Sequence, residues 1–280
     1  MAKKKLLTKE ILKNFMTDRI SITINPKNAF IKLQKRQSFL ISSFFKKTDK
    51  VIINFNNVNY IITILNINSD LVLSISFSIN PIIILKSYLI KNKIYDVTKE
   101  KEFLLKNNMS NNFIHPECIS EKYKFNKLII FKKALEVLEN NIIFAKKILT
   151  TIINILKKNL KININSDFDV KMTVLELCLD IEYSNLNISK EIDKILSGFA
   201  EMGYMIERNN FFIIARKYKN VYYKIYFKAL NLIRFEVVKL RDALGCNMIY
   251  NNAQDFYQKI KLHSEAYEKS LHEFYIAQEI

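Results

Sequence analysis

The amino-acid sequence predicts an α+β protein in which antiparallel sheets pack against helices and leave open one sheet face that bears basic and acidic side chains. Segments with alternating apolar and polar residues, which are typical of half-buried strands, occur before residue 80 and after residue 170. A long stretch between them and shorter stretches after them have apolar residues at helical spacing. Strands and helices in this order favour an α+β architecture.

The pattern divides the chain into three regions. Residues 1–110 are expected to form a β-rich N-terminal region, residues 111–127 a linker or excursion, and residues 128–280 an α+β region with C-terminal helices. In the first region we expect a short helix, a strand, a hairpin, a further strand and a helix that begins with a proline in its first turn. These elements span Thr8–Met16, Arg19–Ile24, Val51–Phe55 with Val58–Leu65, Leu71–Ile79 and Asn80–Leu89.

The middle of the chain predicts a break and then a helix. Charged residues and asparagines dominate between Lys91 and Lys127, which favours a linker. The segment His115–Cys118 has residue types that bind metals, but no second cluster has a matching spacing, so a surface loop is favoured. From Leu128 to Leu160 apolar residues recur at helical spacing, which predicts one long helix or a helical pair interrupted near Asn140-Asn141.

The segment Val174–Tyr183 predicts a strand with two contrasting faces. Aliphatic residues alternate there with Glu176, Cys178, Asp180 and Glu182. Carboxylates two residues apart on a strand lie about 7 Å from each other and repel, so a row of them favours basic side chains on a neighbouring strand or a divalent metal. An amphipathic helix at Ile188–Phe199 and short strands at Tyr204–Ile206 and Phe211–Ala215 follow.

The stretch from Asn220 to Leu240 predicts an antiparallel hairpin with one polar face. If Lys228 pairs with Leu232, Tyr226 lies opposite Arg234 and Lys224 lies opposite Glu236. A tyrosine hydroxyl, cations and a carboxylate would then share one sheet face. The residues expected to be buried on the other face are Ile225, Phe227, Ile233 and Phe235.

The composition is that of a folded basic protein. The net charge of +17 favours a polyanionic partner, although the abundance of Ile, Asn and Lys is also what an AT-rich genome produces. No run of about 18 uncharged apolar residues is present, so we expect no membrane partner. The N-terminus lacks the apolar core of a signal peptide, and the three cysteines lack metal or disulfide spacing, so we expect a cytoplasmic protein with reduced thiols.

The polar hairpin face has the residue types that phosphoryl transfer needs. A tyrosine is a suitable nucleophile toward a phosphodiester, because its ester preserves the phosphate bond energy for a later rejoining step. Cations stabilise charge on the phosphate oxygens, and the expected ones are Lys224, Lys228 and Arg234. Carboxylate oxygens suit Mg²⁺ or Mn²⁺, and the expected metal ligands are Asp180, Glu182 and Glu236.

Two sequence motifs resemble those of the replication initiators of filamentous phages and related plasmids, the gene II endonuclease family. The motifs are Tyr222–Lys228 and Leu232–Leu240, and Leu179-Asp180-Ile181 is similar to the acidic strand of that family. Weaker similarity extends to Asp18–Ile24 and Ile79–Leu85. The resemblance implies that Tyr226 is the nucleophile that cuts one strand of supercoiled DNA, with Lys228, Arg234 and Glu236 in the flanking motif.

Three hypotheses of function follow. The first is a phage or plasmid initiator that binds a replication origin and nicks one strand through Tyr226 for rolling-circle replication, with host replication proteins as further partners. The second is a non-catalytic nucleic-acid-binding protein whose aromatic and lysine side chains stack bases and neutralise phosphates. The third is an interaction or structural protein whose charge reflects genomic bias. The residues expected to contact DNA are Tyr222, Lys224, Lys217 and Lys219.

Overall fold

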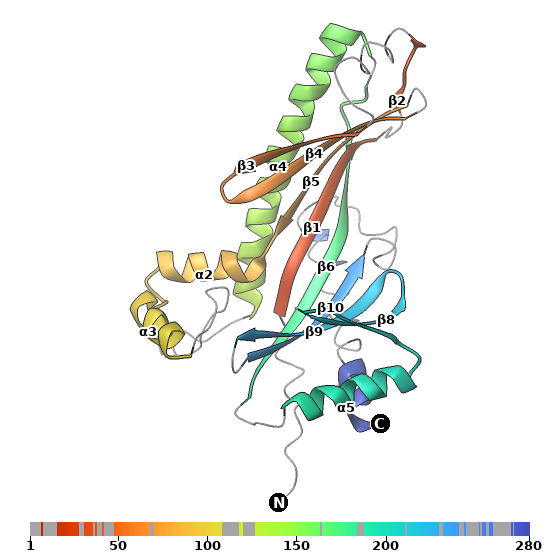
Figure 1. Cartoon of the computed structure of the whole chain (residues 1–280). Helices are drawn as coiled ribbons and strands as arrows, with labels where there is room; N and C mark the ends of the chain where they lie inside the picture. The colour runs from red at the N-terminus through yellow and green to blue at the C-terminus, as the bar shows by residue number, and fades with distance from the viewer. Residues whose placement is uncertain are drawn as a thin grey trace, which may run out of the picture.

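The structure is a computed structural model of the chain, and its longer described segments form one large antiparallel sheet with helices (Figure 1). The described residues are 16–27, 48–67, 70–107, 127–162, 164–183, 188–210, 212–229, 232–240 and 272–280, with short pieces at 7, 31–35, 37, 41, 118–119, 244, 252, 254–255, 258–259 and 270.

The sheet has ten strands, and all of its recorded pairings are antiparallel. The order is β3-β4-β5-β1-β6-β10-β9-β8-β7, and the short β2 pairs with β5. The predicted α+β class is confirmed, with a single open sheet in place of several. The strands are β1 (Met16–Pro26), β2 (Ile31–Lys32), β3 (Thr48–Phe55), β4 (Val58–Ile67), β5 (Asp70–Ile79), β6 (Phe168–Glu182), β7 (Met205–Arg208), β8 (Ile213–Tyr218), β9 (Val221–Ala229) and β10 (Leu232–Leu240).

The two halves of the sheet have the same strand order on either side of the central pair β1 and β6. In one half β1 lies beside β5, which is followed outward by β4 and β3. In the other half β6 lies beside β10, which is followed by β9 and β8. Because β1 precedes residue 110 and β6 follows residue 128, their pairing joins the first and third predicted regions into one continuous sheet.

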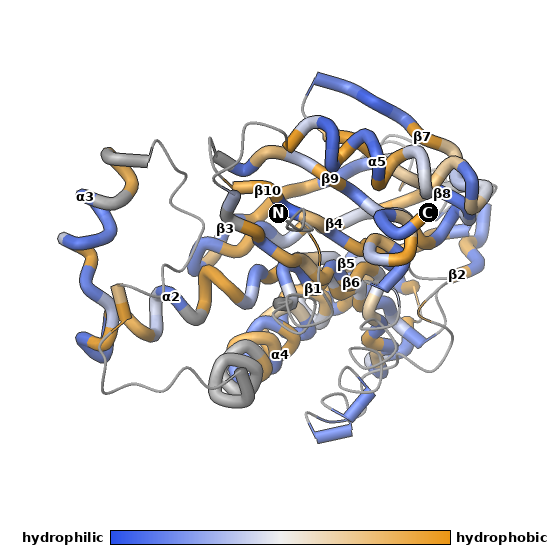
Figure 2. Tube along the Cα trace, turned by 90° about the horizontal axis from the view of Figure 1, so that it is seen from below, coloured by the Kyte–Doolittle hydropathy of each residue, from blue (hydrophilic) through white to orange (hydrophobic). Residues whose placement is uncertain are grey.

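The named helices lie on both sides of the sheet. They are α2 (Pro81–Lys91), α3 (Val97–Asn107), α4 (Lys127–Leu160) and α5 (Ile188–Glu201). Of these, α4 and α5 pack on one face, and α2 contacts the other. Alternate residues of β1 and β6, such as Ile20, Ile22, Leu175 and Leu177, are buried in one apolar core that also contains buried residues of α4 and α5. Figure 2 shows hydrophobic (orange) and hydrophilic (blue) segments interspersed along the strands and helices.

For the middle of the chain, the structure revises one expectation and decides between two alternatives left open for Leu128–Leu160, of which one long helix is confirmed. The stretch expected to be a linker contains α3. The Asp96 carboxylate caps the start of this helix by accepting hydrogen bonds from the backbone N–H groups of Thr98 (2.9 Å) and Lys99 (3.0 Å). Helix α4 is one helix through Asn141, since the Asn141 amide donates to the Val137 carbonyl within the helix (2.6 Å). The segments 8–15 and 115–117 lie outside the described residues.

The first hairpin has the expected turn. Asn56 and Asn57 both have positive φ, 50° and 61°, as a tight two-residue turn between twisted strands requires. Asn80 caps α2 by accepting hydrogen bonds from the backbone N–H groups of Ile82 (2.9 Å) and Ile83 (3.1 Å). Both features follow directly from the residue types at these positions.

The second hairpin has the predicted cross-strand pairs but a different closing pair. Leu232 lies opposite Ala229, not Lys228, and a bulge follows, so that Arg234 lies opposite Tyr226 and Glu236 opposite Lys224. Ile225, Ile233 and Phe235 are buried as expected, whereas Phe227 is 53% exposed. Phe227 lies near the end of β9, where its ring meets the edge of Tyr183.

The sheet face opposite the main core is partly covered. Cys178 lies on this face and is fully buried in a small second cluster with Ile82 and Leu89 of α2, Tyr95 and Cys118. The face predicted to be open is therefore closed at the end of β6 by the α2 segment. None of the helices in the described part of the chain is long and apolar enough to cross a membrane.

Candidate functional site

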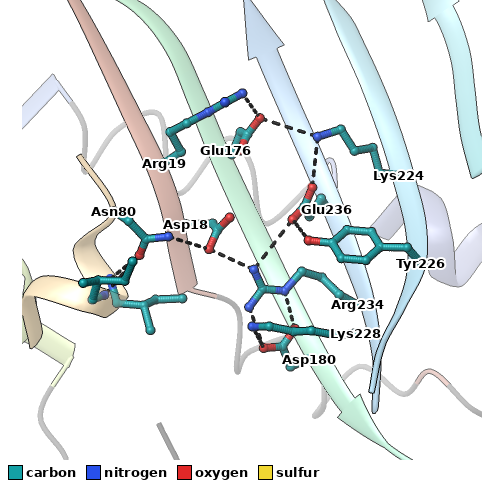
Figure 3. A network of polar contacts seen from close by, with 12 residues as sticks. Asp18, Arg19, Asn80, Glu176, Asp180, Lys224, Tyr226, Lys228, Arg234 and Glu236 are labelled. Atoms are coloured by element: carbon teal, nitrogen blue, oxygen red, sulfur yellow. Dashed lines mark hydrogen bonds and ion pairs between the residues drawn. The ribbon is translucent and has the colours of Figure 1, made fainter. Parts of the chain in front are cut away.

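Four carboxylates and four cations meet on this second sheet face, beside Tyr226 (Figure 3). They come from strands β1, β6, β10 and β9, which are neighbours in the sheet although they are distant in sequence. We call this group the charged cluster. Its members are Asp18, Arg19, Glu176, Asp180, Lys224, Lys228, Arg234 and Glu236.

Arg234 lies at the centre of the charged cluster. Its Nε and Nη2 donate to the two carboxylate oxygens of Asp180 at 2.5 and 2.7 Å, and its Nη1 donates to Asp18 Oδ1 at 2.8 Å. Lys228 Nζ also donates to Asp180, at 3.3 Å. The Arg234, Asp180 and Lys228 side chains are 4%, 2% and 8% exposed, so these charges interact in a medium where their attraction is strong.

Tyr226 points its hydroxyl at Glu236. The Tyr226 Oη donates to Glu236 Oε1 at 2.5 Å, and Lys224 Nζ donates to the other oxygen, Oε2, at 3.2 Å. Arg234 Nη1 lies 3.7 Å from Glu236 Oε1. A phenol, its proton acceptor and two cations are thus held within one small volume (Figure 3).

Lys224 connects this group to β1. Its Nζ lies 3.7 Å from Glu176 Oε1, and Glu176 in turn accepts a short hydrogen bond from Arg19. The Arg19 side chain is 44% exposed, whereas Glu176 is 5% exposed. Arg19 is therefore the member of the charged cluster that faces solvent most openly.

The start of α2 contacts the charged cluster through Asn80. The Asn80 Nδ2 donates to Asp18 Oδ1 at 3.3 Å, while its Oδ1 caps the helix. Asp18 itself lies in a bulge of β1, where Thr17 pairs with Leu177 and Arg19 pairs with Glu176. The bulge turns the Asp18 side chain toward Arg234.

The electrostatics of the site follow from its burial. Burial, and then the Glu236 carboxylate, raise the pKa of the Tyr226 hydroxyl well above its usual range. Burial lowers the pKa of Lys228 although Asp180 opposes this effect. Burial also lowers the pKa of Arg234, but the hydrogen bonds and charge of Asp180 outweigh it, so the net shift is upward and the guanidinium stays charged. Burial raises the pKa of Glu176 against the attraction of Lys224 and Arg19.

Most of the site residues predicted from the sequence are brought together. The expected catalytic residues Tyr226, Lys228 and Arg234 lie with Asp180, Glu236 and Lys224 on one face. The side chain of Glu182 lies outside the described residues.

The four expected DNA-contacting residues are divided between faces. Tyr222 lies on the same face as Tyr226, because both are even-numbered residues of β9 and Tyr222 pairs with Arg216. Lys219 is exposed in the turn between β8 and β9. Lys217 is directed away from this face, because its Nζ donates to the Met202 carbonyl at 3.1 Å and lies over the Tyr204 ring.

Five residues of the site were not among the site residues predicted from the sequence. They are Asp18, Arg19, Asn80, Glu176 and Arg216. The adjacent charges Asp18-Arg19 at the start of an alternating strand are a signal of a bulge, since one of two adjacent side chains would otherwise point into the apolar core.

Of the three predicted metal ligands, Asp180 and Glu236 are described, and both are engaged with other side chains of the charged cluster or with Tyr226. Both oxygens of Asp180 face Arg234 or Lys228, and both oxygens of Glu236 accept hydrogen bonds from Tyr226 or Lys224. Within the described part of the chain, no three His, Cys, Asp or Glu side chains form a group that could hold a metal ion. The Mg²⁺ or Mn²⁺ cofactor stays a prediction.

Comparisons with known proteins do not assign the chain to a family. No family model and no curated protein matches it. Among solved structures, the TBP of Methanococcus jannaschii matches at 9% identity and a TM-score of 0.34, over 95% of this chain and 99% of that chain. A chain of the aspartokinase alpha and beta subunits matches at 9% identity and a TM-score of 0.14, over 88% of this chain and 95% of that chain. At these TM-scores neither likeness bears on fold or function.

Proposed function

We propose that the protein is a replication initiator that nicks one DNA strand at an origin by tyrosine transesterification. The observation that supports this most is the contact of the Tyr226 hydroxyl with Glu236, with Lys224 and Arg234 beside the same carboxylate. A nucleophile, an acceptor for its proton and positive charges are the groups that phosphodiester cleavage requires.

In the proposed reaction Tyr226 Oη attacks the phosphorus of one phosphodiester as its proton passes to Glu236. A bond forms between Oη and phosphorus, the bond from phosphorus to the 3′ oxygen breaks, and that oxygen takes up a proton from water to leave a 3′-OH primer. Lys224 and Arg234 stabilise the negative charge on the phosphate oxygens in the transition state. A phenol is protonated at neutral pH, and the raised pKa of Tyr226 makes loss of its proton harder, so the reaction needs this acceptor.

The test is covalent attachment of Tyr226 to DNA. Supercoiled plasmid with the candidate origin and labelled single-stranded oligonucleotides from it are incubated with protein and Mg²⁺, and protein–DNA adducts are separated by denaturing electrophoresis and mapped by mass spectrometry. Tyr226→Phe is expected to abolish adducts. Tyr222→Phe, four residues away on the same strand and face, is the matched control and is expected to keep them. Adducts that persist in Tyr226→Phe would remove Tyr226 from the mechanism.

The need for a divalent cation is tested in the same assay. Adduct formation is compared with Mg²⁺, with Mn²⁺ and after chelation. Loss of adducts on chelation and their return with either ion would support the proposed cofactor, whereas full activity in chelator would show that the cations of the chain suffice.

A second candidate function is DNA binding without chemistry. The observation that favours it is a stack of cations and an aromatic ring at the edge of the site, in which Arg216 and Lys224 lie 5.3 and 5.7 Å from the centre of the Tyr222 ring. Such a stack can hold an unpaired base and its phosphate. Tight, strongly salt-dependent binding of DNA with no adduct under any condition would favour this function over nicking.

A further inference from the structure

The polar face of the sheet continues beyond the charged cluster into the N-terminal half. Alternate residues of β1, β5 and β4 point to this side, because their neighbours in sequence, such as Ile22, Ile75 and Ile62, are buried in the core. Six of these residues carry a hydroxyl group, and we call those six the hydroxyl face; others on the same side, such as Ile61, Leu65 and Val72, are aliphatic. Its members are Ser21, Thr23, Thr63, Ser74, Ser76 and Ser78.

The hydroxyl face is continuous with the site. Ser21 lies two residues after Arg19 on β1, and its hydroxyl is 2.7 Å from that of Ser78 on β5. Ser76 lies between Thr23 and Ile61 in the register, and Ser74 lies opposite Thr63. Solvent reaches Arg19, whose side chain is 44% exposed.

The two halves of this sheet face differ in chemistry. On the C-terminal half the rings of Tyr222 and Tyr226 lie among cations. On the N-terminal half, the described residues that point to this side of β1, β3, β4 and β5 include no aromatic residue, and β3 and β4 add the exposed Lys50, Ile52, Asn54 and Asn59. Aromatic rings bind single strands by stacking on bases, whereas hydroxyls, amides and lysines contact phosphates and sugars of a duplex.

We propose that the hydroxyl face binds the sugar–phosphate backbone of duplex DNA beside the position at which Tyr226 acts. The inference deepens the proposed function and rests on it for the place of the cut. Duplex DNA is the expected ligand for two reasons. The net charge of +17 favours a polyanion, and the face offers hydrogen-bonding groups to phosphates and sugars. Serine side chains are also small, so a broad DNA backbone can approach the strands closely.

The sheet geometry sets where this duplex lies. From β9, which carries Tyr226, to β5 there are four strand spacings and to β3 there are six. At about 4.8 Å per spacing these distances are about 19 and 29 Å. At about 3.4 Å per base pair along the duplex, the protected backbone is expected to lie within about six to nine base pairs of the cut, on one side of it only.

The experiment places negative charge on the hydroxyl face of the full-length protein. The variant is Ser74→Glu with Ser76→Glu, and the control is Thr150→Glu with Ser197→Glu, which makes the same charge change at exposed positions of α4 and α5. Affinity for a duplex oligonucleotide is measured by fluorescence anisotropy, adduct formation by electrophoresis on a single-stranded oligonucleotide, and folding by thermal melting. The face variant is expected to bind duplex at least about tenfold more weakly than the control, because like charges oppose each other, and to keep the adduct.

The outcomes separate the inference from the proposed function. Loss of duplex binding with the adduct kept supports both. If the face variant loses duplex binding and the unaltered protein forms no adduct, the proposed duplex-binding surface is supported and the proposed nicking activity is rejected. Duplex affinity equal to that of the control overturns the surface, whatever the adduct assay shows. If the face variant melts early, Ser76→Gln and Ser74→Gln replace it, and hydroxyl-radical footprinting of the unaltered protein must show protection on one side of the bound site or the inference fails.

Discussion

The Asp180→Asn substitution tests the charged cluster most directly. It keeps the size of the side chain but removes the negative charge that faces Arg234 at 2.5 and 2.7 Å and Lys228 at 3.3 Å. Because both cations are less than one-tenth exposed, they would be left in the protein interior without their main counter-charge. Breaking a buried pair in this way costs about 3–5 kcal/mol of unfolding free energy.

The expected change in melting temperature follows from the chain length. At about 2.1 cal/mol/K per residue, 280 residues give an unfolding entropy of about 0.6 kcal/mol/K. A loss of about 3–5 kcal/mol then lowers the melting temperature by about 5–8 °C. The control is Asp193→Asn, whose partner Arg208 is 59% exposed and which is itself 61% exposed. An exposed pair contributes about 1 kcal/mol or less, so the control is expected to melt within about 2 °C of the unaltered protein.

A third variant separates charge from packing. Replacing Asp180, Lys228 and Arg234 together by Leu, Leu and Met removes all three buried charges at similar volume, and such replacements are often neutral or stabilising. We expect its unfolding midpoint in denaturant to lie near or above that of the unaltered protein. If Asp180→Asn melts like Asp193→Asn, or if the triple variant is as unstable as Asp180→Asn, the charges of this group are not buried and paired as described.

Three further predictions address the site and its support. Glu236→Gln removes the proton acceptor of Tyr226 and is expected to slow adduct formation by about 10²–10⁴-fold. The remaining rate is expected to rise between pH 7 and 9, as hydroxide takes the place of the carboxylate as base. An unchanged rate would exclude Glu236 as the base. Burial raises the pKa of Glu176, so the folded state holds this proton more tightly than the unfolded chain, and stability contributed by the protonated form is lost as pH rises above about 4.5. Glu176→Gln is expected to flatten that part of the stability curve measured by denaturant unfolding, and an equally steep curve would contradict the assignment. At Gly198 an added Cβ would lie 1.9 Å from the Ala277 carbonyl oxygen, so Gly198→Ala is expected to cost about 1–3 kcal/mol, whereas Ser197→Ala beside it should cost little.

The strands were predictable because their residues alternate. The register of the second hairpin follows from burying Ile225, Ile233 and Phe235 on one side, and the same register is reached although the closing pair is Ala229 with Leu232. Phe227 was expected in the core because it alternates with polar residues. Alternation shows which side of the sheet a residue lies on, but not how close the residue is to the end of its strand. Near a strand end, the side that faces the core can still be exposed.

The central order of the sheet could not be read from local pattern. Pairing of β1 with β6 places Arg19 opposite Glu176 across more than 150 residues of chain, and nothing within either strand specifies the other as its partner. Asp18 reaches Arg234 only because β1 bulges where it meets β6. Long-range pairing of this kind is a property of the whole sheet, so it can be recognised only once all strands compete for neighbours.

The α3 helix was missed because polar contacts, and not an apolar pattern, stabilise it. Its sequence is dominated by charges and has a weak apolar pattern, and it was expected to be a linker. The helix is held by the Asp96 cap and by Glu100, whose buried carboxylate meets Lys86 of α2 and the Tyr95 hydroxyl. Polar contacts with a neighbouring helix replace the apolar stripe here, and periodicity alone does not detect such contacts.

The balance of charge on the site face bears on what the site can bind. Four carboxylates face four cations in the charged cluster, so its buried part presents little net charge to a polyanion. Under the proposed function, attraction to DNA comes from cations outside the charged cluster, such as Lys50 and Lys219, together with the partly exposed Arg19, while the buried pairs fix the positions of Tyr226 and its neighbours. The proposed binding and the proposed chemistry therefore depend on different residues of one sheet face, and we expect substitutions that alter one of them to leave the other intact.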